Sequence, residues 1–150
     1  MTQEEKFMRA ALREAQKAAE EGEVPIGCVI VKDGKIIARG RNAREKKKNA
    51  LLHAEICAID RACKRLSGWR LWQCEMYVTL EPCPMCGGAI INSRLKKVYI
   101  GAKDPKAGAM GSVLNLLDHP FNHKPEIQHG LLEDESKRLL KDFFARLRER

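Results

Sequence analysis

Apolar residues in the first twenty positions recur at the three- and four-residue spacing of one helical face. They are Phe7, Met8, Ala11, Leu12, Ala15, Ala18 and Ala19. This spacing predicts an amphipathic helix. Thr2 and Glu5 stand three positions apart, as in a capping box. Gly22 follows the last apolar position, so we expect the helix to end there.

Shorter apolar runs follow, and they predict strands. Residues 26–31 and 35–38 flank Asp33-Gly34, which is the strongest short hairpin signal in the chain. A basic loop is expected from Arg39 to about Asn49. Further strands are expected at 76–80 and 97–101, and a short one at 126–129.

Helices are expected between and after these strands. One spans 53–66 with Ile56, Ile59 and Ala62 on its inner side, and a second begins at Pro82-Cys83. A short helix near 113–117 and a closing helix over 133–150 complete the prediction. Strands that alternate with helices indicate a sheet covered on both faces. The chain contains no repeat or linker, so residues 1–150 are expected to form one domain.

The composition adds a basic surface to this picture. At 150 residues with 44% apolar content, the chain can bury a core without disulfide bonds. Its 28 Lys and Arg against 20 Asp and Glu leave a net charge of +8. The charge alone fits an inert basic surface and a phosphate-binding surface about equally well. The basic residues, however, are clustered at 39–48, at 94–106 and near the C-terminus at 137–150.

The chain shows no sign of secretion or of a membrane span. Residues 1–21 are charged throughout and lack the apolar core of a signal peptide, and there is no run of 18 apolar residues. We therefore expect a cytoplasmic protein with reduced cysteines. Cys28, Cys63 and Cys74 are expected to be small buried residues.

Two short motifs carry the chemistry. The first is His53-Ala54-Glu55, and the second is Pro82-Cys83-Pro84-Met85-Cys86. Cys83 and Cys86 can reach one metal ion from the first turn of a helix, and His53 would join them from a second helix. Catalytic zinc takes three protein ligands and leaves one position to water. Glu55 lies about 200° round the helix from His53, so it is free to move protons instead of binding the metal.

Cys57 leaves a second interpretation open. It lies four residues after His53, on the same helical face. With Cys83 and Cys86 these two residues would form a closed structural zinc site that has no place for water. In such a site Glu55 would have no bound water to deprotonate. We therefore favour the open site and expect Cys57 in the core.

The H-x-E and P-C-x-x-C motifs form a pattern that resembles the signature of zinc nucleobase deaminases. Further segments resemble the bacterial tRNA-specific adenosine deaminases, and they are collinear over nearly the whole chain. These segments are 22–27, 40–42, 77–86, 104–108, 121–123 and 142–144.

The resemblance implies a cytidine-deaminase-like, three-layer α/β/α sandwich with a five-stranded mixed sheet. It also implies hydrolytic conversion of the wobble adenosine of a tRNA anticodon loop to inosine, with release of ammonia. One Zn²⁺ per subunit would be held by His53, Cys83 and Cys86, with Glu55 as the catalytic acid and base. A homodimer is implied as well.

The resemblance further implies a pocket for the flipped base. Asn42 would hydrogen-bond the purine, and Val24, Pro25 and Ile26 would form the wall on which it packs. Ala54 could offer its backbone N–H near the base, because the first N–H groups of a helix lack helical partners. From the residues alone, the favoured interpretation would be that Asn42 is an ordinary loop residue and Pro25 the start of a strand.

The anticodon stem-loop would bind around this pocket. Asp104 and Lys106 match family residues that line the RNA groove, and Phe144 is expected to stack on RNA while Phe143 packs in the core. Other expected contacts are Arg44, Asn122, His123 and Arg148. Trp69 and Trp72 are expected in the core or at a dimer interface.

Two departures and two rival functions remain. Leu52 stands where the family commonly has alanine, and the basic stretch 44–48 has no counterpart that we can interpret. One rival is a deaminase of a free base or nucleoside, because the zinc chemistry would be the same. The other is a structural zinc module that binds RNA without catalysis.

Overall fold

The computed structural model describes residues 1–149. Its elements are α1 (Gln3–Glu20), β1 (Gly27–Lys32), β2 (Lys35–Arg41), α2 (Arg44–Lys47), α3 (Ala54–Leu66), β3 (Cys74–Leu80), α4 (Pro84–Asn92), β4 (Lys97–Ala102), the 3₁₀ turn η1 (Leu116–Asp118), β5 (Glu126–Gln128) and α5 (Glu133–Arg148). Arg150, where the predicted closing helix ends, lies outside the described residues.

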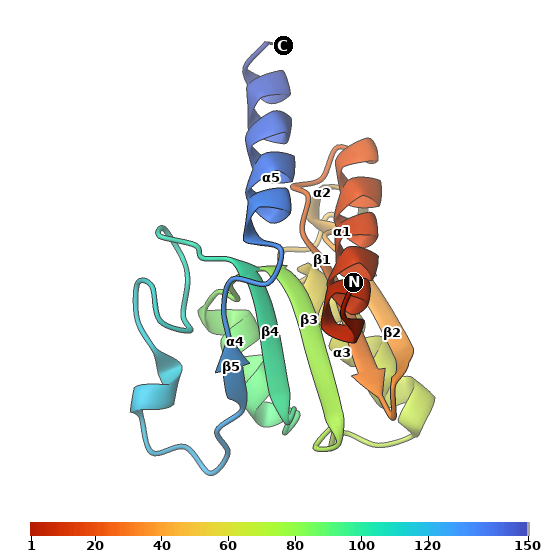
Figure 1. The fold of residues 1–150 in the computed structure, drawn as a ribbon, viewed down its shortest axis with the longest axis vertical. Coiled ribbons are helices and arrows are strands. Elements are labelled where there is room, and N and C mark those ends of the chain that lie inside the picture. The colour runs from red at the N-terminus through yellow and green to blue at the C-terminus, as the bar shows by residue number, and fades with distance from the viewer. Residues whose placement is uncertain (150) are drawn as a thin grey trace.

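The strands form one mixed sheet in the order β2-β1-β3-β4-β5. β1 is antiparallel to β2 and to β3, whereas β3, β4 and β5 are parallel. Helices α3 and α4 cover one face of the sheet and α1 covers the other, while α5 begins against the end of β4 and extends beyond the upper edge of the sheet (Figure 1). This arrangement confirms the predicted sandwich with a five-stranded mixed sheet. The carboxyl ends of β3 and β4 meet at the upper edge in Figure 1.

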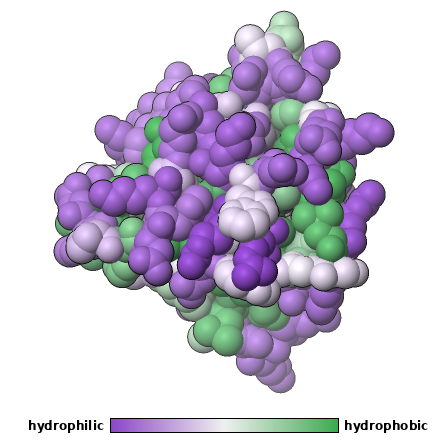
Figure 2. Space-filling model, turned by 90° about the horizontal axis from the view of Figure 1, so that it is seen from below, coloured by the Kyte–Doolittle hydropathy of each residue, from purple (hydrophilic) through white to green (hydrophobic). Residues whose placement is uncertain are grey.

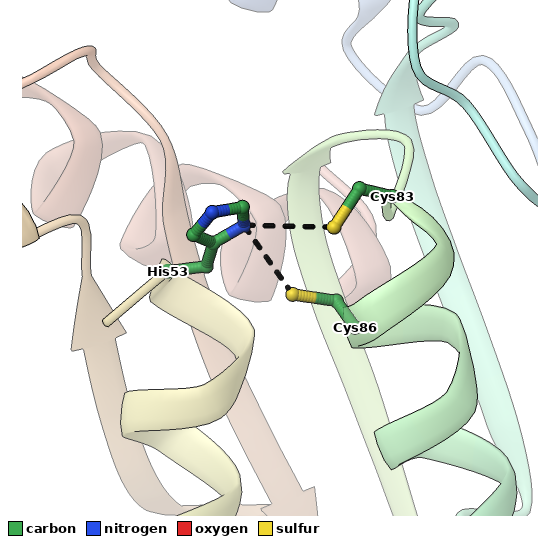
Figure 3. A group of neighbouring side chains, drawn as sticks. All are labelled: His53, Cys83 and Cys86. Atoms are coloured by element: carbon green, nitrogen blue, oxygen red, sulfur yellow. Dashed lines mark hydrogen bonds between the residues drawn. The ribbon is translucent and has the colours of Figure 1, made fainter. Parts of the chain in front are cut away.

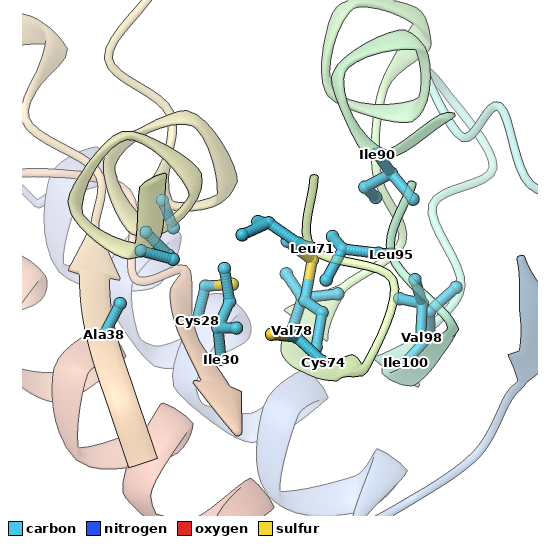
Figure 4. Close-up of a cluster of buried hydrophobic side chains, with 14 of the residues drawn as sticks. Cys28, Ile30, Ala38, Leu71, Cys74, Val78, Ile90, Leu95, Val98 and Ile100 are labelled. Atoms are coloured by element: carbon cyan, nitrogen blue, oxygen red, sulfur yellow. The ribbon is translucent and has the colours of Figure 1, made fainter. Parts of the chain in front are cut away.

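The core beneath α3 and α4 is built from branched side chains of the sheet and small side chains of the helices (Figure 4). Ala54, Ala58 and Ala62 are the buried apolar residues of α3. Ile56, which we predicted on the inner side, is only half-buried, and Ile59 packs at the margin of the core. Small residues face inward because α3 lies very close to β2. A Cβ atom on Gly40 would lie 2.3 Å from the Ala54 carbonyl oxygen.

The opposite core is aromatic. Tyr77 and Tyr99 stack with ring centroids 4.4 Å apart and planes 3° apart, and Phe7 of α1 packs 5.3 Å from Tyr77. Here α1 approaches β1 closely, because Gly27 has no side chain to hold it away. The two faces therefore share one device, a strand glycine under a helix.

The N-terminal predictions are confirmed in detail. The Glu5 N–H donates to Thr2 Oγ1 at 3.0 Å, and the Thr2 N–H donates to Glu5 Oε1 at 2.9 Å. Gly22 follows α1 with φ of +80°, a conformation that glycine adopts without strain. Within residues 1–149, no helix has the length and apolar character that crossing a membrane requires.

Two predictions about connecting segments were wrong. The expected loop over 39–49 instead contains the end of β2 and the short helix α2. The helix expected near 113–117 is a 3₁₀ turn displaced to Leu116–Asp118, where the Asn115 side chain accepts the Leu117 N–H at 3.1 Å. For Trp69 and Trp72, exposed fractions of 50% and 60% exclude the core alternative, and the dimer interface stays a prediction.

Candidate active site

Two helix starts bring three metal-binding side chains together. His53 is the N-cap residue of α3, Cys83 is the N-cap residue of α4, and Cys86 lies in the first turn of α4. His53 Nδ1 lies 3.6 Å from Cys83 Sγ and 3.5 Å from Cys86 Sγ (Figure 3). The three ligand atoms all lie within 4.8 Å of one another. The zinc ligands that we predicted from sequence therefore converge on one point.

These separations fit a tetrahedral zinc ion. In a tetrahedral site, zinc bonds of about 2.3 Å to sulfur and about 2.0–2.1 Å to nitrogen place a nitrogen and a sulfur ligand about 3.5–3.6 Å apart. Cys57 does not belong to the group of converging ligands among residues 1–149. The closed four-ligand site is therefore not formed, and a fourth position is left for water or substrate.

The pKa values of the two thiols are shifted in opposite directions. A hydrogen bond from the Cys86 thiol, together with one from His53, lowers the pKa of Cys83 to about 3. The same interaction with Cys83, together with burial, raises the pKa of Cys86. Because zinc takes thiolates as ligands, binding of the ion must displace the proton that Cys86 retains.

Glu55 lies beside the metal group and is not part of it. Its side chain is almost wholly enclosed, with 4% of the residue exposed. Burial raises the pKa of the Glu55 carboxyl to about 7. A carboxyl that titrates near neutral pH can both accept and return a proton, which general acid–base catalysis requires.

His53, Cys83 and Glu55 line a cavity of about 430 Å³, and we call this part of the lining, with Cys86 behind it, the cavity base. A cavity of this size suits a single purine nucleoside unit. Predicted site residues that line it are Val24, Ile26, Asn42, Arg44, Asp104, Lys106 and Phe144. Lining residues that we did not predict are Leu80, Glu81, Lys103, Pro105, Ala107 and Leu140.

Asn42 and Ala54 are engaged with each other. The Ala54 N–H donates to Asn42 Oδ1 at 2.9 Å, so this N–H is already satisfied within the protein. Ala54 is fully buried and does not line the cavity. The prediction that Ala54 offers its N–H to a base is therefore wrong. Asn42, whose oxygen is occupied, would meet a ligand through its amide NH₂ group.

The other predicted contacts lie away from the cavity. Pro25 is buried between its two lining neighbours, and Arg148 lies at the exposed far end of α5. His123 Nε2 pairs with the Leu95 carbonyl oxygen at 2.6 Å, near the start of β4. Asn122 and His123 therefore lie at the opposite end of the parallel strands. That end is seen in Figure 2, where mostly hydrophilic residues cover the surface.

On α5, the prediction that Phe143 packs in the core is not met, because Phe143 is only half-buried and belongs to neither core cluster. Phe144 is 40% exposed and lines the cavity, whereas Phe143 is more enclosed and does not line it. Leu140, one helical turn earlier, joins Phe144 in the cavity wall. The closing helix thus supplies an apolar rim to a cavity whose base is polar.

Fold and metal group together define a deaminase. A model of the MafB19-like deaminase family matches residues 2–148. A solved guanine deaminase from Nitrosomonas europaea superposes with a TM-score of 0.80 at 25% identity, covering 94% of this chain and 84% of that one.

Relatives with higher sequence identity indicate which kind of deaminase this is. The tRNA-specific adenosine deaminase of Bacillus subtilis is 52% identical over 100% of this chain and 94% of its own length. That of Aquifex aeolicus is 48% identical over 96% of this chain and 95% of its own. A structure from a study of A-to-I editing by tRNA:A34 deaminases superposes with a TM-score of 0.87 at 45% identity, covering 89% of this chain and 98% of that one. The chain belongs to the tRNA-specific adenosine deaminase family.

Proposed function

We propose that this protein hydrolyses the wobble adenosine of a tRNA anticodon loop to inosine, with water consumed and ammonia released. The observation that carries the proposal is the composition of one cavity. Its base holds the metal-binding group and Glu55, and its walls carry the cations Arg44, Lys103 and Lys106. A free nucleoside has no phosphate for these cations to neutralise, whereas a nucleotide within RNA has one on each side.

The metal we propose is zinc, one ion per chain, held by His53 Nδ1 and the two cysteine sulfurs. Histidine and thiolate ligands in tetrahedral arrangement favour zinc. When bound in such a site, zinc lowers the pKa of water to about 7 and so supplies a nucleophile in neutral solution. Three protein ligands leave the fourth coordination position to this water.

Glu55 would carry the protons. Its carboxylate would accept one proton from the attacking water and deliver it to the ring nitrogen beside C6 of adenine. It would then take the remaining proton of the oxygen added at C6, which becomes the carbonyl of inosine, and pass that proton to the amino group as the C6–N bond breaks and ammonia leaves. Each transfer needs a carboxyl whose two forms are close in free energy, and burial of Glu55 moves its pKa to about 7. Enclosure also keeps bulk water from competing for these protons.

The remaining wall residues would orient the base. The Asn42 amide NH₂ would donate to a purine acceptor, while Val24 and Ile26 provide an apolar surface for the ring. Phe144 is placed to stack on a neighbouring base, which is a common way for proteins to hold unpaired RNA. Asp104 and Lys106 would meet the backbone at the cavity mouth.

We further propose that the chain acts as one domain, as a homodimer in the cytoplasm. Exposed aromatic and apolar side chains are available for a partner surface. They include Leu51, Trp69, Trp72 and Val113, each at least 50% exposed. Asn122, His123 and Arg148 do not reach the cavity of their own chain. A role for them in RNA binding would therefore require a second copy or RNA that extends beyond the cavity.

A second candidate function is deamination of a free purine base. The likeness to the guanine deaminase of Nitrosomonas europaea favours it. The cations in the cavity walls argue against this second function, because a neutral purine base carries no charge for them to neutralise.

The deciding experiment compares a tRNA anticodon stem-loop that carries a wobble adenosine with free adenosine, cytidine and guanine. Inosine at the wobble position, with equimolar ammonia, is the expected result. Turnover of a free base or nucleoside with the stem-loop untouched would favour the second candidate. Metal-loaded protein that converts none of them would indicate a structural metal module.

A further inference from the structure

Four glutamates are buried among residues 1–149, each with at most 4% of the residue exposed. Glu55 lies at the metal group, and Glu14 accepts only from the side chains of Lys17 and Arg41. Glu23 and Glu81 differ from both. Each accepts hydrogen bonds from backbone N–H groups of a segment more than twenty residues away in sequence. A buried carboxylate bonded in this way determines where a backbone segment lies.

Glu23 holds the helix α2. Its carboxylate accepts the Lys46 N–H at 2.7 Å and the Glu45 N–H at 3.2 Å. The N-cap residue of α2, Ala43, has no side-chain oxygen to serve these groups. Glu23 therefore replaces the missing cap from another part of the chain. Arg44, in the first turn of this helix, lines the cavity.

Glu81 holds the opposite wall. Its carboxylate accepts the N–H groups of Asp104, Met110 and Ser112 at 3.0–3.1 Å, and also the Ser112 hydroxyl. The segment is folded tightly round the carboxylate: a Cβ atom on Gly108 would lie 2.4 Å from Glu81 Oε2. The same segment brings Lys103 and Lys106 to the cavity.

We propose that Glu23 and Glu81 are positioning residues that hold the two basic walls at the separation needed by the RNA phosphates flanking the reacting adenosine. The inference rests on the proposed function. Neither segment has enough regular structure to place its cations unaided, since α2 has four residues and the 103–112 segment has no helix or strand. Anchoring the backbone of these segments before RNA arrives removes the entropy cost of ordering that backbone on binding.

The test uses Glu23→Gln and Glu81→Gln, each of which keeps the side-chain shape but replaces one acceptor by a donor. With a wobble-adenosine stem-loop as substrate, we expect KM to rise about tenfold through weakened phosphate binding, with kcat and zinc content unchanged. The slope of log KM against log salt should fall by about 0.7 for each phosphate that is no longer neutralised. Glu14→Gln, a buried glutamate without backbone partners, is the matched control and should leave KM and slope unchanged.

A double-mutant cycle separates positioning from general loosening. If Glu23 acts through Arg44, then Glu23→Gln in an Arg44→Ala background should raise KM no further. Ser112→Ala offers a milder change at the Glu81 wall should Glu81→Gln fail to fold, and it should raise KM in the same direction. Unchanged KM and salt slope in the glutamine variants, or fully additive effects with Arg44→Ala, would overturn the positioning role. A wild-type protein that leaves the stem-loop untouched would instead overturn the proposed function itself.

Discussion

The base of the cavity and its walls are built in contrasting ways. The base is carried by the starts of two helices packed on the sheet, so His53 and Cys86 owe their places to the core. The walls are carried by a four-residue helix and an irregular segment, and each depends on one distant buried carboxylate. Chemistry that tolerates little displacement thus rests on the rigid scaffold, while substrate selection rests on separately anchored segments.

The largest expected effect concerns Glu55, at the cavity base. Glu55→Ala should lower kcat on the stem-loop by at least about 10³-fold, because proton transfer to and from the substrate is lost. The zinc content should stay at one ion per chain, since Glu55 is not a ligand. An inosine assay and elemental analysis of the same sample measure both quantities. Substantial turnover by the zinc-loaded variant would contradict the role given to Glu55.

Removal of a metal-ligating cysteine should affect metal binding, activity and stability together. Cys83→Ser should abolish tight zinc binding, with it deamination, and also lower the melting temperature, because the ion links α3 to α4. Cys57→Ser is the matched control on α3 and should keep both metal and activity. Loss of zinc in Cys57→Ser would revive the closed four-ligand site.

The close packing of β2 against α3, which carries His53, gives a third prediction. In Gly40→Ala the new methyl group would meet backbone atoms of α3 at 2.3–2.6 Å. We expect destabilisation of about 1–3 kcal/mol from overpacking, and weaker zinc binding as His53 is displaced. Gly88→Ala on α4 adds its methyl group in open space and should be neutral or stabilising. Thermal unfolding of the zinc-loaded proteins compares the two, and equal melting temperatures would contradict the packing argument.

The smallest expected effect concerns Glu21, which pairs with Lys46 of α2, and the stability of the protein in acid. Hydrogen bonds from Arg41 and then Lys46 lower the pKa of Glu21 to about 2, whereas the unfolded chain returns it to the ordinary value of 4.5. Stability from this group is therefore present above pH 4.5 and is lost as the pH falls from 4.5 towards 2. Glu21→Gln should flatten the acid limb of stability against pH only slightly, because the carboxylate is solvent-accessible. An unchanged acid limb would show that the ion pairs contribute nothing measurable.

The same contrast explains how much could be predicted from sequence. The metal ligands and Glu55 were predictable because each motif is local, and the helix starts follow directly from it. The alternation of strand and helix periodicities predicted a sheet covered on both faces, and the family resemblance specified the five-stranded sandwich. The Glu23 and Glu81 anchors were missed because their partners lie 22–31 residues further along the chain. No local pattern records such a contact.

The small errors have the same origin. The α2 helix was taken for a loop because it is four residues long and its cap comes from Glu23. The Ala54 N–H was assigned to the substrate because nothing near it in sequence announces that Asn42 accepts it. Signals that could have helped were the buried acidic residues themselves, Glu23 beside Val24-Pro25 and Glu81 beside Pro82-Cys83, which stand in apolar surroundings without an obvious partner.

The central claim is that one zinc ion on His53, Cys83 and Cys86 enables deamination of an adenosine within RNA. The most direct test is to titrate metal-free protein with zinc while measuring inosine at the wobble position of an anticodon stem-loop. We predict no conversion without metal and a linear rise that saturates at one zinc per chain. Full conversion by the metal-free protein, or none after one equivalent of zinc is bound, would contradict the account.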